Sequence, residues 1–420
     1  MGPADSAGSL RSRIAVDIGS TVIKIARVQA DGGLQEQTLH GRDFDAGIAR
    51  QVEGLLDALG VVRDDDVLVC SSANGGLRVG IVSLTPLFSG AALRNQVLLA
   101  GGNPLFVHDL DEAPSSVPAV DILLVGGGID CDDADPLRDR LNRFDHRRYR
   151  YGTLVYAGNA ALADDFVRTH PGAAVIPNPL RDGLAGRNPT VFEALRRAYL
   201  DDLVHKEGIS ELRSSLARGI RPTPEVVSRG FLRALQNRSS IKIAGACILM
   251  DIGGATTDFH YTVEIVSDDS EQRPFEGSSV ARYVFVDLGV VASRESTLLQ
   301  LRTHPRLYEF LARTVSGDVQ DAYRLLREGE YAPSSALLSY ACVFLGLDRF
   351  AQGHGPGLPK ASLGKVAELI LSGGAAQMLD PEVVLRLFAL LAPTARPEVL
   401  IDRRYQVWVD GITWTDDAPR

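Results

Sequence analysis

The sequence predicts an α/β fold with two similar lobes and an α/β subdomain inserted into the first lobe. Two segments, beginning at Ile14 and Ile248, share one pattern: an apolar strand ending in Asp, then Ile-Gly, a small turn, Thr and a second apolar strand. Between them, residues 72–180 alternate apolar strands with amphipathic helices. A third glycine-bearing turn, Gly373-Gly374, follows the apolar run 369–371 and Ser372. The repeated hairpin predicts two halves of like fold, and the alternation predicts a largely parallel sheet.

The first lobe begins with strands in residues 14–39, where Asp31-Gly32-Gly33 supplies a hairpin turn. A helix is expected over Phe44–Leu59, because apolar residues recur on one face. A short buried strand follows at Val67–Cys70. This order of strands and helix opens the first lobe.

The inserted subdomain is expected to continue as strand, helix, strand. Its expected strands are 78–83, 104–108, 122–125, 153–156 and 173–176, and its helices are 88–100, 135–144 and 160–169. In such a parallel sheet, ligands or partners are expected near the carboxyl ends of the strands.

Helices dominate residues 189–237, with a break at Arg221-Pro222-Thr223-Pro224. The second lobe begins near Ala246. Its expected strands are 247–252, 256–265, 282–287, 366–371 and 399–401, and its helices are 290–303, 305–313, 317–327, 333–350 and 375–391.

These patterns predict the domain boundaries. The expected parts are a flexible tail (1–13), the first part of lobe I (14–71), the inserted subdomain (72–180), the helical completion of lobe I (181–245), lobe II (246–410) and a tail (411–420).

Composition narrows the class of protein. The 420 residues are 45% hydrophobic and carry a net charge of -9, which argues against a sequence-independent nucleic-acid binder. No apolar run is long enough for a transmembrane helix, and the N-terminus lacks the apolar core of a signal peptide. The four cysteines form no CxxC pair, so a reducing cytoplasm is the expected location.

The hairpins suit a magnesium nucleotide. Asp17 and Asp251 end the first strands, and carboxylates there are expected to act on Mg²⁺ through its bound waters; they are the predicted catalytic and metal residues. Glycines let the backbone approach phosphate oxygens, and hydroxyl groups and a lysine add donors. The predicted nucleotide-binding residues are Gly19, Ser20, Thr21, Lys24, Gly253, Gly254, Thr256, Thr257, Gly373 and Gly374.

A simpler interpretation remains open, in which the glycines only make turns. The matching strand context of the two hairpins favours the nucleotide site. Gly373-Gly374 is expected to let adenine and ribose lie against the backbone, although any strand-to-helix turn can use this pair. Asn159, Asp182 and Asp258 are unranked candidates for positioning a hydrolytic water.

The three Gly-bearing segments together resemble the phosphate-1, phosphate-2 and adenosine motifs of the actin, hexokinase and heat-shock-70 superfamily. A closer resemblance, over residues 14–410, is to the glutamate mutase L family. Its landmarks here are SSANGGL (71–77), GGGID (126–130), YAGN (156–159), PTP (222–224) and DIGGATTD (251–258). Asn74, residues 129–133 and the region after 290 depart from the family pattern.

The resemblance implies two actin-like (ribonuclease H-like) lobes around a nucleotide cleft, with ATP and Mg²⁺ as cofactors. It also implies a Mg-dependent ATPase that is a chaperone or reactivator of an adenosylcobalamin-dependent glutamate mutase, whose subunits are its partners. ATP and ADP would favour different closures of the lobes.

Three other functions remain to be weighed. A small-molecule kinase of the same superfamily would need an acceptor pocket with a catalytic Asp. A filament-forming relative would sediment in a nucleotide-dependent manner. An iron–sulfur activator of a radical dehydratase would need cysteines poised for a cluster, and this cysteine spacing does not supply them.

Overall fold

The structure is a computed structural model, and it divides into two compact units. Unit 1 comprises residues 1–73, 204–242 and 404–420, and unit 2 comprises residues 74–203 and 243–403. The residues that the structure describes are 12–29, 33–43, 46–61, 67–72, 77–99, 102–112, 117–131, 134–180, 212, 216, 219–270, 279–315, 335–355 and 358–414.

Unit 1 is built on a five-stranded sheet in the order β10-β4-β1-β2-β3. Strands β1, β2 and β3 pair antiparallel, whereas β4 and β10 extend the sheet in parallel from β1. The strands are β1 (Arg13–Ile18), β2 (Val22–Val28), β3 (Leu34–Gly41), β4 (Val67–Ser71) and β10 (Arg221–Pro222). The helices that the structure describes in this unit are α1 (Ile48–Ala58), α7 (Thr223–Leu235) and α13 (Gln406–Ile412).

Helices α7 and α13 pack with their backbones almost in contact. A Cβ placed on Gly230 of α7 would lie 1.8 Å from the Val407 carbonyl oxygen, and one on Gly411 of α13 would lie 1.8 Å from the Val226 carbonyl oxygen. Any side chain at either glycine would force the helices apart. The C-terminal helix is therefore an integral part of unit 1.

Unit 2 contains a second five-stranded sheet, in the order β13-β12-β11-β14-β15. Its strand directions repeat those of the first sheet: β11, β12 and β13 pair antiparallel, and β14 and β15 follow in parallel. The strands are β11 (Cys247–Ile252), β12 (Thr257–Thr262), β13 (Val280–Phe285), β14 (Glu368–Ser372) and β15 (Glu398–Ile401). Both sheets have the ribonuclease H-like topology, which confirms the predicted α/β class with two actin-like lobes.

Four of the helices that the structure describes belong to the second lobe. They are α8 (Arg294–Thr303), α9 (Pro305–Val315), α11 (Ser335–Gln352) and α12 (Pro381–Leu391). Helix α11 supplies much of the buried core, including Phe344 and Phe350, and the latter ring packs edge-on against Phe259 of β12. The helix predicted over 375–391 is interrupted: a 3-10 turn ends at Met378, and α12 restarts at Pro381, where a proline is favoured because it needs no N–H partner.

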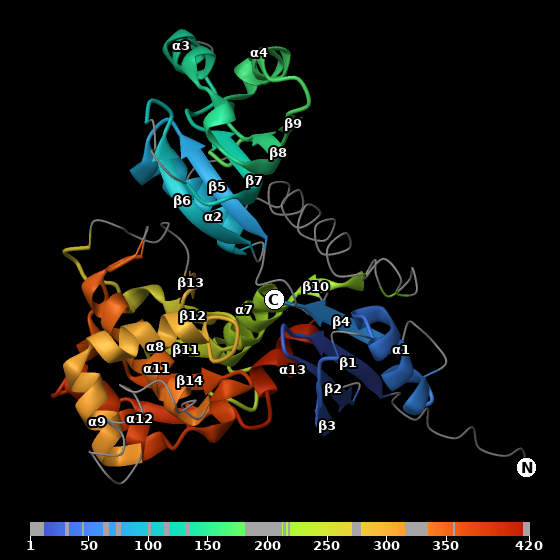
Figure 1. Cartoon of the computed structure of the whole chain (residues 1–420), viewed down its shortest axis with the longest axis vertical. Helices are drawn as coiled ribbons and strands as arrows, with labels where there is room; N and C mark the ends of the chain where they lie inside the picture. Colours follow the sequence, from blue (N-terminus) through green and yellow to red (C-terminus); the bar gives the residue numbers. More distant parts are fainter. Residues whose placement is uncertain are drawn as a thin grey trace, which may run out of the picture. The chain divides into compact units, whose positions relative to one another are not determined.

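The inserted subdomain belongs to unit 2 and holds a third sheet, in the order β6-β5-β7-β8-β9, with every pairing parallel. Counted along the chain, this is the 2-1-3-4-5 order of flavodoxin-like sheets. Its elements are β5 (Arg78–Ser83), α2 (Ala91–Leu99), β6 (Asn103–Asp109), β7 (Val120–Gly126), α3 (Asp135–Arg143), β8 (Tyr151–Tyr156), α4 (Ala163–Thr169) and β9 (Ala174–Val175) (Figure 1).

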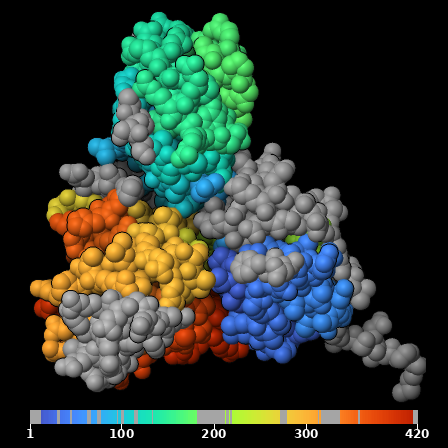
Figure 2. Space-filling view, in the orientation of Figure 1, coloured from blue at the N-terminus to red at the C-terminus, as the bar shows by residue number. Residues whose placement is uncertain are grey.

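The described elements of the insert, β5 to β9, follow one another along the chain, and their surface is coloured from blue through teal to green (Figure 2). In sequence it stands between β4 and β10, two strands of the first sheet. A π-helix at Pro86–Gly90 precedes α2, which therefore begins later than predicted.

Several predictions concern residues outside the described part, among them most of the N-terminal tail, Asn74, Asp182 and the helix at 317–327. Helix α13 was not predicted; it ends at Ile412, so Gly411 and Ile412 are buried within the segment expected as a tail. Among the helices that the structure describes, none combines the length and the apolar character needed to cross a bilayer.

Candidate functional site

The first hairpin joins β1 and β2 through a tight turn. The Gly19 amide donates to the Val22 carbonyl oxygen at 2.9 Å, and Asp17 faces Lys24 across the two strands. Asp17 is 1% exposed, so its carboxylate needs charged or hydrogen-bonding partners. Ser20 and Thr21 form the turn itself.

Asp17 has those partners within unit 1. Lys24 Nζ lies 2.6 Å from Asp17 Oδ2, and the Thr223 hydroxyl donates to Asp17 Oδ1 at 2.6 Å. The Lys24 ammonium also lies 5.0 Å from the Tyr405 ring centroid and 5.6 Å from that of Trp408. The aromatic rings, both from the C-terminal segment, thus help to hold the lysine on the carboxylate.

A buried thiol lies beneath this carboxylate. Cys70 Sγ is 3.4 Å from Asp17 Oδ1, and the Trp408 indole N–H donates to the sulfur at 3.1 Å. Burial, and next the charge of Asp17, raise the pKa of the Cys70 thiol well above its usual value. Cys70 therefore stays protonated and is a packing residue rather than a nucleophile.

The second hairpin has the same turn. The Gly253 amide donates to the Thr256 carbonyl oxygen at 2.9 Å, and Asp251 occupies the position that Asp17 has in the first hairpin. Opposite Asp251, however, stands Asp258 rather than a lysine. Two carboxylates thus face each other across these strands, and one of them needs an external cation.

Arg282 of β13 supplies that cation. Its Nε donates to Asp258 Oδ1 at 2.9 Å, and its terminal nitrogen pairs with the same oxygen. The side chains are 4% and 11% exposed, so the pair is buried. Asp258, a candidate for positioning water, is therefore committed to an ion pair.

In both hairpins the turn carbonyls are bound from the segment after the third strand. Arg42, after β3, donates its amide to Thr21 O at 3.0 Å and a guanidinium nitrogen to Ser20 O at 3.4 Å. After β13, the amides of Val291 and Ala292 both donate to Gly254 O at 2.8 Å. Carbonyl oxygens would repel phosphate, so fixing them on protein donors favours phosphate on the amides of the same turns.

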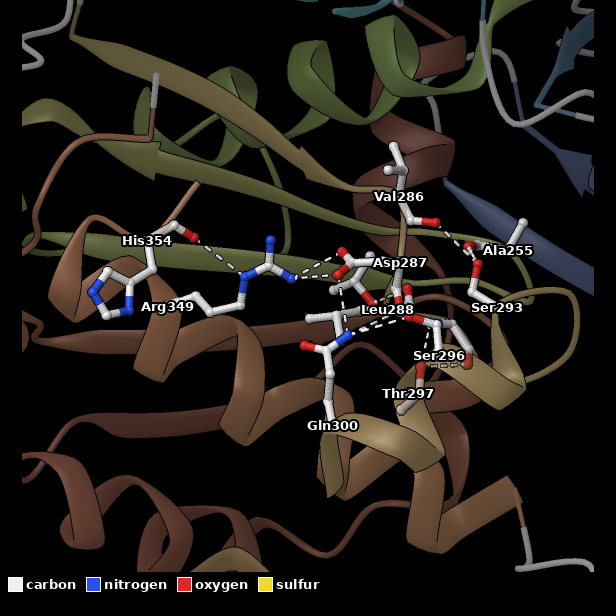
Figure 3. Close-up of polar contacts among 12 residues, drawn as sticks. Ala255, Val286, Asp287, Leu288, Ser293, Ser296, Thr297, Gln300, Arg349 and His354 are labelled. Carbon is white, nitrogen blue, oxygen red and sulfur yellow. Dashed lines mark hydrogen bonds and ion pairs between the residues drawn. The ribbon is translucent and has the colours of Figure 1, made fainter. Parts of the chain in front are cut away.

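The loop that performs this task in unit 2 is itself braced (Figure 3). Ser293 Oγ lies 2.5 Å from Ala255 O and 3.0 Å from Val286 O. Arg349 NH1 lies 2.8 Å from both carboxylate oxygens of Asp287, and Gln300 donates to Asp287 at 3.0 Å (Figure 3). Helices α8 and α11 therefore set the position of the second turn.

The predicted hydroxyl donors differ in placement. Thr256 lies at the end of the turn, and its hydroxyl donates to Asp258 Oδ2 at 3.3 Å. Thr257 is fully buried and donates to Leu288 O at 3.0 Å, so it supports the loop after β13 from within the core.

The third segment meets the second hairpin within unit 2. Ser372, the last residue of β14, pairs with Asp251 of β11. Gly373 then adopts φ +88, and a Cβ there would lie 2.5 Å from Asp251 Oδ1. Only glycine fits both the backbone conformation and this close approach. Gly374 follows and is the N-cap of the 3-10 turn that starts at Ala375.

Other candidates from the sequence are engaged elsewhere. Asn159 donates to Ile129 O at 2.8 Å and Cys131 O at 3.2 Å, so it fixes the glycine-rich loop of the insert. Among the described residues, no group of three or more His, Cys, Asp or Glu side chains is arranged to hold a metal.

Sequence reasoning missed five of the described residues, which contact Asp17, Lys24 or Asp258 directly or through Cys70: Cys70, Thr223, Arg282, Tyr405 and Trp408. Thr223 lies in the Pro-Thr-Pro landmark, whose role the sequence did not reveal. The others reach the hairpins only through tertiary contacts from distant segments.

The model of the MutL protein family matches residues 13–411 of this chain. Protein MutL of Clostridium tetanomorphum is 24% identical over 300 residues, which are 65% of this chain and 65% of that protein. The chain thus spans about two thirds of the length of this curated relative.

Solved structures that match this chain include the activator of the 2-hydroxyisocaproyl-CoA dehydratase from Clostridium difficile with bound ADPNP, at 9% identity and a TM-score of 0.35, covering 96% of this chain and 93% of that one. A ROK family glucokinase from Streptomyces griseus in complex with glucose and AMPPNP is 13% identical, with a TM-score of 0.32 and coverage of 96% and 98%. These TM-scores are low, so the fold assignment rests on the order and direction of the strands. The family match covers nearly the whole chain, which therefore belongs to the MutL protein family.

Proposed function

We propose that this protein binds Mg·ATP through its two Asp-Ile-Gly hairpins and hydrolyses it. The observation that carries the proposal is the duplication itself. Each hairpin has a carboxylate at the end of its first strand, and in each the turn carbonyls are bound by the segment after the third strand. Backbone amides presented in this way suit the phosphate chain of a nucleotide.

The donor chemistry suits magnesium. Mg²⁺ keeps several waters and needs only one or two carboxylates besides the phosphates, and Asp17 and Asp251 are carboxylates of this kind. Magnesium would supply positive charge against the β- and γ-phosphates. Asp17 is held by Lys24 and Thr223 in this structure, so in the complex Lys24 is expected to turn from Asp17 toward phosphate.

Calorimetry with Mg·ATP tests the site. The double variant Asp17→Asn with Asp251→Asn should weaken binding by about 10- to 100-fold, because these carboxylates act through the metal's outer shell. The matched control is Asp164→Asn, which changes an exposed carboxylate in α4 of the insert. Undiminished heat in the double variant would place the nucleotide elsewhere.

Release of inorganic phosphate without any acceptor tests hydrolysis. Steady turnover with Mg·ATP alone supports an ATPase. Turnover that depends on adding a small metabolite supports the rival kinase interpretation instead.

We further propose that the partner is an adenosylcobalamin-dependent glutamate mutase or a related mutase, which the protein serves as a chaperone or reactivator. Membership of the MutL family supports this assignment. Co-purification with tagged mutase subunits should differ between ATP and ADP, because a reactivator must bind and release its client. Equal recovery of the subunits with both nucleotides, or none with either, would contradict this role.

A further inference from the structure

One buried arginine links the second hairpin to the inserted subdomain. Arg282 binds Asp258 through Nε and Nη2, and its remaining nitrogen, Nη1 (NH1), donates to the Leu98 carbonyl oxygen at 2.8 Å. All of these groups lie in unit 2. A single guanidinium therefore holds a strand of the second sheet and a helix of the insert.

Each end of this link has a defined role. On one side, Asp258 also accepts from the Thr256 hydroxyl at 3.3 Å, and Thr256 closes the turn of the hairpin. On the other side, Leu98 lies in the last turn of α2, where helix carbonyls have no partner within the helix and carry partial negative charge. Arg282 satisfies both negative groups at once.

The physical setting makes the link stiff. The guanidinium is a flat, rigid fork, so a change in direction at Nε must move NH1 as well. With the Arg282 side chain 4% exposed, little water is available to replace a protein partner that moves away. A lysine ammonium in the same place would be a single point donor and would not couple the two groups in this way.

We propose that Arg282 is a positioning residue that transmits nucleotide occupancy of the second hairpin to helix α2 of the inserted subdomain. The proposal rests on the proposed function. A phosphate oxygen at the turn competes with Asp258 for the Thr256 hydroxyl. Asp258 loses the hydrogen bond from Thr256 and changes its position against Arg282. Arg282 then moves relative to the Leu98 carbonyl oxygen. The hydrogen bond from Arg282 to the last turn of α2 would become stronger or weaker, and the stability of that turn would change with it.

Hydrogen exchange of the α2 amides tests this, measured with and without saturating Mg·ATP. In the natural protein the nucleotide should change their exchange rates by about fivefold or more, the lower range of ordinary allosteric coupling. Arg282→Lys should abolish most of that change while Mg·ATP still binds in calorimetry. The control Arg302→Lys, at an exposed position in α8, should leave it intact.

The outcomes separate this inference from the proposed function. If Mg·ATP gives no binding heat with the natural protein, the proposed function fails first. If it binds but α2 exchange is unchanged, or if Arg282→Lys responds like the natural protein, the link through Arg282 is wrong.

A second variant covers the case in which Arg282→Lys does not fold. The double change Asp258→Asn with Arg282→Gln replaces the ion pair by two neutral amides, which can still bond to each other. It should fold, bind Mg·ATP and show no transmitted change in α2. A full response of α2 in this variant would overturn the proposal.

Discussion

The two hairpins share one backbone and differ in how they neutralise charge. Each hairpin has an aspartate near the end of its first strand, Asp17 or Asp251. The residue opposite it on the second strand is Lys24 in the first hairpin and Asp258 in the second. In the first, the ion pair is local, since Asp17 and Lys24 belong to the same two strands. In the second, the cation Arg282 comes from the next strand and also binds the insert. The first hairpin therefore has both charges of its ion pair within its own two strands. The second hairpin depends on a cation from the next strand that also binds the inserted subdomain.

The largest expected effect is in the second hairpin. Arg282→Met would leave Asp258 buried without its cation, at a cost of about 3 to 5 kcal/mol. Native-state hydrogen exchange of the β11 and β12 amides measures this locally, which suits a chain with two units. The matched variant Arg302→Met should change it little. A loss below 1 kcal/mol, on the order of an exposed pair, would show that the ion pair is not the main support.

Lys24→Met makes the same test in the first hairpin. Asp17 would keep the Thr223 hydroxyl, so the expected cost is near the lower end of the same range, about 3 kcal/mol. The readout is exchange of the β1 and β2 amides. The comparison breaks if this variant also alters α2 of the insert, because a self-contained pair should act only within unit 1.

The third prediction concerns pH and distinguishes the two sheets. His260 of β12 is buried, and burial followed by the charge of Arg282 lowers its pKa well below the usual value. Below about pH 6.5 the unfolded chain binds a proton that the folded chain does not, so stability should fall by about 1.4 kcal/mol per pH unit as the pH decreases.

Exchange of the β12 amides between pH 7 and pH 5 measures this slope, after correction for intrinsic exchange rates. His260→Gln should remove the part of this slope that comes from the uptake of one proton by the unfolded chain. Strands β1 and β2 contain no histidine, so their amides serve as the internal reference. An unchanged slope in the variant would assign the pH dependence to other groups.

The smallest effect is expected at the loop that braces the second turn. Ser293→Ala removes the hydroxyl that lies 2.5 Å from Ala255 O, a loss of about 1 kcal/mol for one hydrogen bond. Exchange of the 253–256 segment should rise accordingly. Ser296→Ala is the control, because that hydroxyl bonds to Gln300 instead. If both variants behave alike, the brace does not act through Ser293.

Much of the fold followed from local patterns in the sequence. The apolar runs at Val67–Ser71 and Cys247–Ile252 form buried strands as predicted, because continuous apolar runs bounded by turns are typical of strands covered on both faces. The order of the parallel strands in the insert was not predicted, but their parallel pairing was. Helix α13 was missed because it is seven residues long and follows Tyr405 in a left-handed conformation, so it has little periodicity to detect.

The candidate site was predictable only in part. The turns and their aspartates were predicted from short segments of sequence, because a Gly shortly after an apolar strand that ends in Asp is a local pattern. Lys24, which neutralises Asp17, lies in the same hairpin, but other partners come from farther along the chain: Thr223 donates to Asp17, and Arg282, 24 residues beyond Asp258, pairs with Asp258. These contacts of Thr223 and Arg282 depend on tertiary packing, and no local pattern in one sequence encodes them.

The seating of α13 in unit 1 has a consequence for biosynthesis. Unit 1 takes strands β1 to β4 from residues 13–71 and helix α13 from residues 406–412, so Tyr405 and Trp408 reach Lys24 and Cys70 only after the intervening residues, which include unit 2, have been synthesised. Domains otherwise tend to mature in the order of translation. Here the strands of residues 13–71 must wait for α13, and a nascent chain halted before Arg404 would have Lys24 and Asp17 without the Tyr405 and Trp408 rings.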